Sequence, residues 1–213
     1  MLKPFLILLF ALTGLVACQE SALPPKSDRY PWQITLMADG SSRIFGIHLG
    51  VTTVAEARQQ LGKGPRLALF ENPDGALSLE LFYKEFNRAG LSGKLILTAG
   101  GAKETLQNLK QQSRKNKKLE SGVVQHYLDK GLLSVIDSML ITAMTYMPYA
   151  NLEEEVVSAR FGEPAEKIRT HEKAQHWLYP DRGLDLIINE EGKEILQYVP
   201  PEDFGKLLKP LRS

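Results

Sequence analysis

Apolar and polar residues alternate along several short stretches of the chain, which is the pattern of a β-strand. In Ala76–Tyr83, three leucines and Tyr83 occupy every second position and therefore share one face. Other apolar runs bounded by turn residues predict further strands. These predicted strands span Pro31–Met37, Ser42–Leu49, Arg66–Phe70, Lys94–Ala99, Val123–Leu128, Met139–Met147, Ala165–Thr170, Gln175–Tyr179, Leu184–Asn189 and Glu194–Val199. Turn residues at Ala38–Ser41 and Glu190–Lys193 predict that the first two and the last two strands form hairpins.

Three other stretches carry apolar residues at helical spacing. Thr53–Leu61 begins with Thr53 and has Glu56 three residues later, which is the pattern of a capping box. Gly62 follows and is expected to end this helix. Lys103–Arg114 has two leucines on one face and predicts a second helix.

The third predicted helix begins near Leu152, with Asn151 as its expected N-cap. Acidic residues 153–155 crowd its first turn, where the helix dipole favours negative charge. Gly162, followed by Pro164, is expected to end it.

The order of helix, glycine, proline and strands occurs twice, and Gly62 and Gly162 are 100 residues apart. This order favours a duplicated unit; two unrelated units with similar helix ends are the alternative. We therefore predict a monomeric α+β fold of two related helix-plus-antiparallel-sheet units, with the helices on one face of the sheet. The predicted segments are a leader at 1–17, a tether at 18–29, a first unit at 30–101, a connection at 102–149 and a second unit at 150–213.

The N-terminal residues have the pattern of a signal peptide. Lys3 is followed by the apolar stretch Phe5–Val16, which is shorter than the about 20 residues of a membrane-spanning helix. The end of this stretch and the two residues after it, Leu15–Cys18, read Leu-Val-Ala-Cys and resemble the lipobox of bacterial lipoproteins. The resemblance implies cleavage before Cys18 and acylation of its thiol and new amino group. An ordinary secretory signal with a chance cysteine is the alternative.

The residues after Cys18 indicate in which membrane such a lipoprotein would be located and how far its folded part could lie from that membrane. Gln19 stands where an Asp would retain such lipoproteins in the inner membrane, so the resemblance implies the periplasmic face of the outer membrane. The polar stretch Gln19–Arg29 contains two adjacent prolines and predicts an extended tether of at most about 36 Å.

Composition narrows the classes of function. The 213 residues carry 26 Lys and Arg against 25 Asp and Glu, and this near neutrality argues against a nucleic-acid-binding protein. The chain has one cysteine, which excludes an intramolecular disulfide and a cysteine-rich metal site. A hydrophobic content of 43% is sufficient for a packed core.

Three segments of the second half, Leu152–Pro164, Trp177–Tyr179 and Leu184–Val199, resemble the SmpA/OmlA family of small outer-membrane lipoproteins. The family pattern is a helix with an apolar-Gly-x-Pro stop, a Trp-x-Tyr strand and an alternating hairpin. The first half matches through Leu61 and Gly62 but lacks Trp-x-Tyr. The resemblance implies a protein that binds partners without catalysis, as in an accessory subunit of the β-barrel insertion machine. A similar tandem unit in a secreted β-lactamase inhibitor protein presents a concave sheet to an enzyme.

Sequence motifs for catalysis are absent, since the chain has neither a Gly-x-Ser-x-Gly elbow nor a phosphate loop. His171 and His176 are a near miss to the zinc motif His-Glu-x-x-His, because they are five residues apart rather than four. We therefore expect no enzymatic activity, metal or cofactor. Acids such as Asp181 and Asp185 leave a hydrolase as a minor alternative.

Two groups of residues are candidates for binding. A basic run predicts contact with the phosphates of an anionic membrane surface, with a solvated helix end and loop as the alternative. The run consists of Lys110, Arg114, Lys115, Lys117 and Lys118. Trp177 and Tyr179 are either core residues or anchors for a protein partner. Tyr30 and Trp32, at the end of the tether, are expected to cover an apolar edge.

The function expected from these features is that of a lipid-anchored, non-enzymatic module. It would bind a periplasmic or outer-membrane protein partner during envelope or outer-membrane assembly, and no nucleic acid. The alternative is an inhibitor-like or small-ligand-binding periplasmic protein that uses a groove between the two halves.

Overall fold

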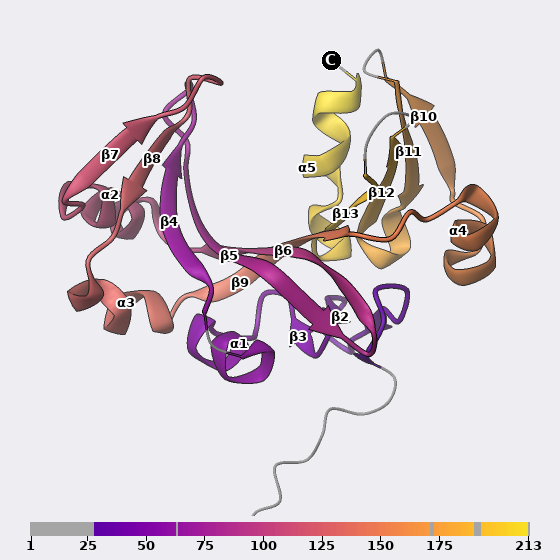
Figure 1. Cartoon of the computed structure of the whole chain (residues 1–213), viewed down its shortest axis with the longest axis horizontal. Coiled ribbons are helices and arrows are strands. Elements are labelled where there is room, and N and C mark those ends of the chain that lie inside the picture. Colours follow the sequence, from indigo (N-terminus) through magenta and orange to yellow (C-terminus); the bar gives the residue numbers. More distant parts are fainter. Residues whose placement is uncertain (1–27, 63, 171–172, 190–192, 213) are drawn as a thin grey trace, which may run out of the picture.

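A computed structural model describes residues 28–62, 64–170, 173–189 and 193–212, and its main feature is one ten-stranded antiparallel sheet. The strands are β4 (Arg66–Glu71), β5 (Leu77–Arg88), β6 (Leu91–Gly100), β7 (Lys115–Lys118), β8 (Val124–Tyr127), β9 (Leu140–Pro148), β10 (Glu166–Arg169), β11 (Ala174–Tyr179), β12 (Leu184–Asn189) and β13 (Ile195–Tyr198). Their order is β10-β11-β12-β13-β9-β6-β5-β4-β8-β7. The sheet bends strongly, so that its two ends rise as walls on either side of a central floor (Figure 1).

The α+β class and the large antiparallel sheet are confirmed. The sheet is continuous because β9 pairs with β6 on one side and with β13 on the other. Two predicted strands proved longer than expected, since β5 and β6 extend to meet at a tight turn at Ala89 and Gly90.

A small second sheet lies under the large one and contains β1 (Thr35–Leu36), β2 (Ser42–Ile44) and β3 (Ile47–His48). The predicted hairpin is present, because Thr35 pairs with Arg43. The second predicted strand is divided, however. Phe45 and Gly46 both have positive φ angles, of 53° and 83°, and this tight turn folds β3 back on β2.

Within the described ranges, five α-helices border the sheet. They are α1 (Val54–Leu61), α2 (Lys103–Gln111), α3 (Leu133–Asp137), α4 (Glu154–Phe161) and α5 (Gly205–Leu208), with short 3-10 segments at Lys130–Leu132, Pro180–Arg182, Pro201–Asp203 and Lys209–Arg212. None of the helices in the described ranges is long and apolar enough to cross a lipid bilayer.

The capping box of α1 is confirmed. The backbone N–H of Glu56 donates to Thr53 Oγ1 at 3.2 Å, and the backbone N–H of Thr53 donates to Glu56 Oε2 at 2.8 Å. The N-cap expected for α4 is wrong. Its N-cap is Glu153, without a side-chain hydrogen bond, and Asn151 lies too far ahead of the first turn. The amide oxygen of Asn151 instead accepts a hydrogen bond from Lys193 Nζ.

The main core lies on the convex face of the sheet. Buried residues of α1, α2 and α4 pack there against inward-facing strand residues such as Leu79 and Leu81. The expectation of helices on one face does not extend to α5. Phe204 and the leucines that follow it pack with Leu178 and Val199 on the concave face. Leu178 points to the face opposite to that of its neighbours Trp177 and Tyr179 in β11. Its apolar side chain is therefore buried by α5 rather than by the main core.

The N-terminal described residues lie on the convex side with the small sheet (Figure 1). Arg43 pairs there with Asp28 at 2.9 Å. The ring of Tyr30 stacks on Trp32, and Trp32 meets Phe161 edge-on. The buried hydroxyl of Tyr198 donates to the carbonyl of Pro31 at 2.9 Å. Trp32 is packed against the core, as the sequence led us to expect.

Candidate functional site

The concave face of the sheet carries a continuous row of side chains that spans eight strands. Strand register sets this row, because residues paired directly across antiparallel strands point to the same face. From β4 to β10 the row consists of Arg66, Phe82, Ile96, Thr145, Gln197, Asp185, Leu178 and Glu166.

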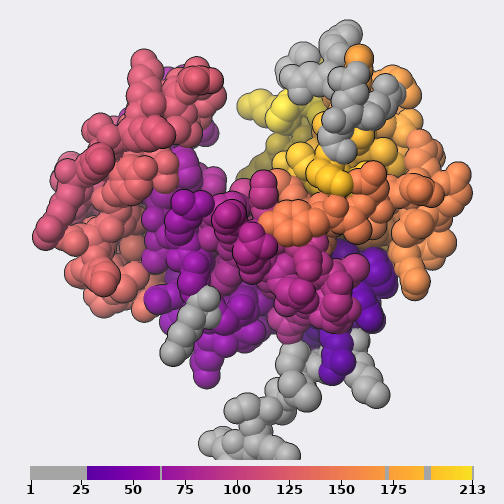
Figure 2. Space-filling model, viewed as in Figure 1, coloured from indigo at the N-terminus to yellow at the C-terminus, as the bar shows by residue number. Residues whose placement is uncertain are grey.

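The middle of this face is not covered by any helix in the described part of the chain. We call Phe82, Ile96, Thr145, Met147 and Gln197 the central strip; Met147 joins it because it lies on the same face of β9 as Thr145. All five side chains are half-buried by their neighbours in the sheet and open on one side. Figure 2 shows the hollow above these strands, between the two walls. A concave surface on which Phe82, Ile96 and Met147 lie beside two polar side chains is typical of a site for protein or ligand binding.

The charge on the concave face is mainly positive. Arg66 lies over the ring of Phe82, with 5.3 Å from its guanidinium carbon to the ring centre, and Lys94 pairs across the ladder with Met147. Lys117 belongs to the same face because it pairs with Gln125, which itself pairs with Phe70. Lys115 follows by the two-residue period of the strand.

The carboxylates on the concave face neutralise little of this positive charge. Asp185 is buried against His176, and Glu166 pairs with Arg212 at 2.9 Å. Glu80 lies on the same face, across the ladder from Ala68 and Thr98. Burial raises the pKa of Glu80, which disfavours the charged form of this carboxyl group. A partner with an apolar crest and acidic flanks would complement this face.

The basic run predicted from the sequence is divided by the structure. Residues 115–118 form β7, the exposed edge strand of the sheet, and not a loop. Lys110 pairs with Glu71 at 2.6 Å, and Arg114 pairs with Asp129 at 2.5 Å. Lys115, Lys117 and Lys118 make no ion pair with any residue that the structure describes. Lysines on an edge strand also hinder edge-to-edge association of sheets.

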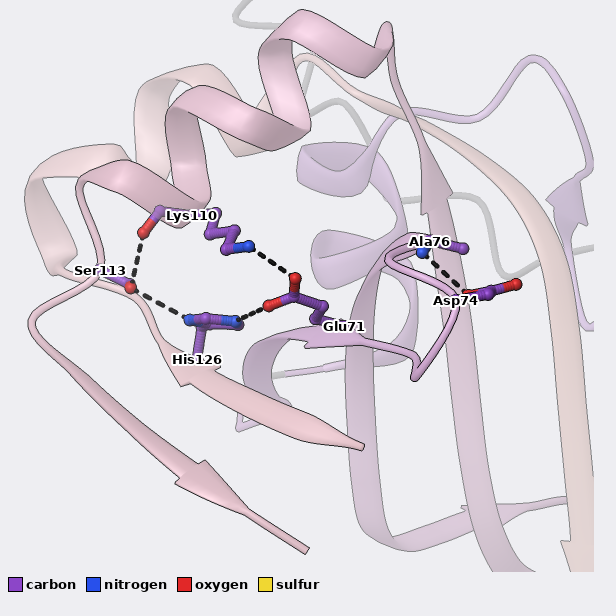
Figure 3. A network of polar contacts seen from close by, with 6 residues as sticks. All are labelled: Glu71, Asp74, Ala76, Lys110, Ser113 and His126. Carbon is purple, nitrogen blue, oxygen red and sulfur yellow. Dashed lines mark hydrogen bonds and ion pairs between the residues drawn. The ribbon is translucent and has the colours of Figure 1, made fainter. Parts of the chain in front are cut away.

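A polar network links α2 to the sheet edge (Figure 3). Ser113 Oγ lies 3.3 Å from His126 Nδ1, and His126 Nε2 lies 3.0 Å from Glu71 Oε2. Glu71 also accepts a hydrogen bond from Lys110. The hydrogen bonds from Lys110 and His126 lower the pKa of Glu71.

The network contains serine, histidine and glutamate, but its geometry does not suit nucleophilic catalysis. The hydroxyl of Ser113 donates to the carbonyl of Lys110 at 2.7 Å, so its proton is directed away from His126. His126 is only 4% exposed, which leaves little access for a substrate. The network is therefore interpreted as a clamp that holds α2 against β4 and β8.

Trp177 and Tyr179 lie in the core and are not exposed anchors for a partner. Their exposed fractions are 1% and 5%. Trp177 Nε1 donates to Gln175 Oε1 at 2.8 Å, and the hydroxyl of Tyr179 donates to the carbonyl of Gly162 at 2.8 Å. Burial raises the pKa of Tyr179 to about 12. Of the two roles considered for these residues, the structure supports packing between the sheet and α4.

Of the two histidines of the near-miss zinc motif, only His176 lies in the described residues. His176 is buried, and its Nδ1 lies 2.8 Å from Asp185 Oδ2. His171 and the lipidation candidate Cys18 lie outside the described residues. The part of the chain that the structure describes contains no group of three or more potential metal ligands.

Comparison of the chain with protein-family models, with curated proteins and with solved structures finds no match. Function is therefore inferred from the geometry of the concave face. Sequence reasoning missed the central strip, although a signal was present. Phe82 and Ile96 are apolar residues at the positions of their strands that should be polar if only one face were buried.

Proposed function

We propose that this protein is a lipoprotein, anchored through Cys18 to the periplasmic face of the outer membrane, that binds a protein partner without catalysis. Its role would lie in envelope or outer-membrane assembly. The observation that carries the proposal is the uncovered central strip on the floor of a concave sheet. Aromatic and aliphatic side chains in such a position provide the apolar centre of an interface, and the surrounding cations provide its polar rim.

The position of the N-terminal segment supports this arrangement. Asp28 lies on the convex side, and the concave face opens on the opposite side (Figure 1). A tether from Cys18 would therefore hold the convex side toward the membrane and leave the concave face open to periplasmic proteins.

We also propose that the two halves arose by duplication of one unit. The strand order supports this, because each half has a helix followed by three strands that are neighbours in the sheet and succeed one another toward its centre. In the first half these are α1, β4, β5 and β6; in the second they are α4, β10, β11 and β12. The next strand inward is β13 in the second half and β9 in the first half, where α2, β7, β8 and α3 intervene in the chain. β9 and β13 pair at the centre of the sheet. The same order is consistent with the resemblance to the SmpA/OmlA family.

The partner is expected to present a convex element with an apolar crest and acidic flanks. The crest would rest on Phe82 and Ile96, and the flanks would face Arg66 and Lys117. Complementary charge of this kind raises the rate and specificity of association more than it raises affinity.

A crosslinking experiment tests this proposal. A photoreactive residue at position 82 of the full chain is expected to capture a reproducible partner from membranes. The substitution Ile96→Arg should abolish the capture, because it places a bulky charge in the strip. Val156→Arg is the matched control, since Val156 is 41% exposed on α4, which packs on the convex face. Retention of the partner by Ile96→Arg, or its equal loss in Val156→Arg, would contradict the proposal.

The identity of the captured protein separates the two functional classes. An integral or membrane-bound protein supports the assembly role, whereas a secreted enzyme supports the inhibitor-like alternative. Thermal unfolding with that enzyme should then show a higher Tm, because a ligand that binds the folded state stabilises it.

The anchor has a separate test. Mass spectrometry of protein from its host is expected to show an acylated Cys18 as the first residue, and Cys18→Ser should release the chain from the membrane fraction. A leader that remains uncut, or a Cys18→Ser variant that stays in the membrane fraction, would remove the anchor from the proposal while leaving the concave binding face in place.

A further inference from the structure

A cavity of about 530 Å³ lies on the convex side, between the C-terminal end of α1 and the β5–β6 turn. Its lining includes two arginines, Arg29 and Arg88, together with Gln60 and Asn87. Phe86, which is buried, forms part of the wall. The volume is within the range of about 300–1,000 Å³ that is typical of small-molecule sites. No carboxylate is among its described lining residues.

The charge of Arg88 lacks a close partner in the described part of the chain. Arg88 is half-buried, and no described residue accepts a hydrogen bond from its guanidinium. Asp28 attracts it electrostatically. The carboxylate of Asp28, however, already pairs with Arg43 at 2.9 Å and accepts a hydrogen bond from Thr35 at 3.3 Å. Burial lowers the pKa of Arg88, and the charge of Arg29 acts in the same direction.

The polar groups converge near the turn of the small sheet. A methyl group placed at Gly46 would lie 3.2 Å from Gln60 Oε1 and 3.8 Å from Arg88 Nη2. The carboxamide and the guanidinium therefore lie close together over Gly46. A carboxamide can supply hydrogen-bond donors beside the two cations.

We propose that this cavity binds a phosphate-type oxyanion, held by the guanidinium groups of Arg29 and Arg88. Each guanidinium presents a planar fork that can donate two hydrogen bonds to oxygen atoms of one anion. A carboxylate can accept from both forks only if each of its two oxygen atoms is shared, whereas a phosphate group offers three or four oxygen atoms in a tetrahedral arrangement. Its charge also matches the two cations.

The phosphate could belong to a free ion or to a lipid headgroup, and the position of the cavity is compatible with both. Arg29 is the last residue of the predicted tether, so the cavity is within about 36 Å of a lipid-anchored Cys18 by chain length. The inference concerns the convex side and is independent of the concave binding face.

The test uses the full chain in non-ionic detergent micelles and phosphate-free buffer. Inorganic phosphate is titrated in one arm, and phosphatidylglycerol is added to the micelles in the other, with binding measured by calorimetry and by the shift in Tm. Binding in the first arm assigns the site to a free phosphate, and binding only in the second assigns it to a lipid headgroup. Binding in neither arm, at millimolar phosphate or at equal molar ratios of lipid and detergent, would overturn the proposal.

Substitutions connect the binding to the cavity. Arg88→Gln is expected to weaken binding about tenfold or more, because it removes a charged hydrogen-bond donor. Lys84→Gln is the matched control: it removes the same charge from an exposed position of the same strand, outside the cavity. Arg29→Gln provides a second variant should Arg88→Gln fail to fold. An equal loss of affinity in Lys84→Gln and in the arginine variants would show a general charge effect and contradict the site.

Discussion

Two carboxyl groups on this sheet show how the immediate surroundings of a residue determine its pKa. Glu71 is partly exposed and receives hydrogen bonds from Lys110 and His126, which lower its pKa. Asp185 is 1% exposed, and burial raises its pKa despite the hydrogen bond with His176. The two residues are expected to affect stability in opposite directions as pH changes.

Glu71→Gln is expected to lower the free energy of unfolding by about 1 kcal/mol at neutral pH, as for a partly exposed ion pair. Because the pKa of Glu71 is lower in the folded chain than its usual 4.5, its contribution is complete above pH 4.5 and is lost as the pH falls through the folded-state value. Urea denaturation at pH 7 and pH 3 measures the effect. A deficit of equal size at both pH values would argue against the clamp.

Trp177 offers a test of core packing against surface binding at a single residue. Trp177→Ala should cost about 3–5 kcal/mol of stability, because the buried ring leaves a cavity. Val156→Ala, at an exposed position, should change stability by less than about 0.5 kcal/mol. Chemical denaturation of both variants provides the measurement. A small cost at Trp177 would mean that its ring is free for other contacts.

At the scale of elements, the helices α1 and α4 differ in how they begin. The start of α1 has a complete capping box, whereas α4 has no side-chain cap. Thr53→Ala is therefore expected to cost about 1 kcal/mol. Asn151→Ala should cost less, since Asn151 does not cap α4. Thermal unfolding of the two variants measures the stability lost in each. An equal loss of stability in both would show that Asn151 supports α4.

Local sequence signals predicted most elements. They failed where a segment's own pattern of apolar residues does not match the structure that its pairing with another strand gives it. The segment Lys115–Lys118 has no apolar alternation, so nothing in it predicts a strand. It is extended because its backbone pairs with β8. The helix α3 and the short C-terminal helices were also missed. In α5 the leucines are too few to show helical periodicity, and packing on Leu178 and Val199 stabilises the segment.

At the scale of the whole molecule, the continuous sheet is expected to make the two halves unfold together. Both tryptophans, Trp32 and Trp177, report on the second half, because Trp32 contacts Phe161 and Trp177 lies in β11. Their fluorescence and far-UV circular dichroism should therefore give coincident urea transitions, since β9 joins both halves. A second transition seen by circular dichroism alone would mean that the first half unfolds independently.

The sequence alone determined the elements with strong local patterns, namely the α1 capping box, the alternating strands and the glycines that end helices. It also carried the leader and lipobox signals on which the proposed location rests. Only the tertiary structure decided that β9 joins the halves, that Trp177 and Tyr179 are buried, and that Phe82 and Ile96 share an open concave face. These outcomes depend on strand order and sheet curvature. Both arise from pairings between residues far apart in the chain, which no local pattern encodes.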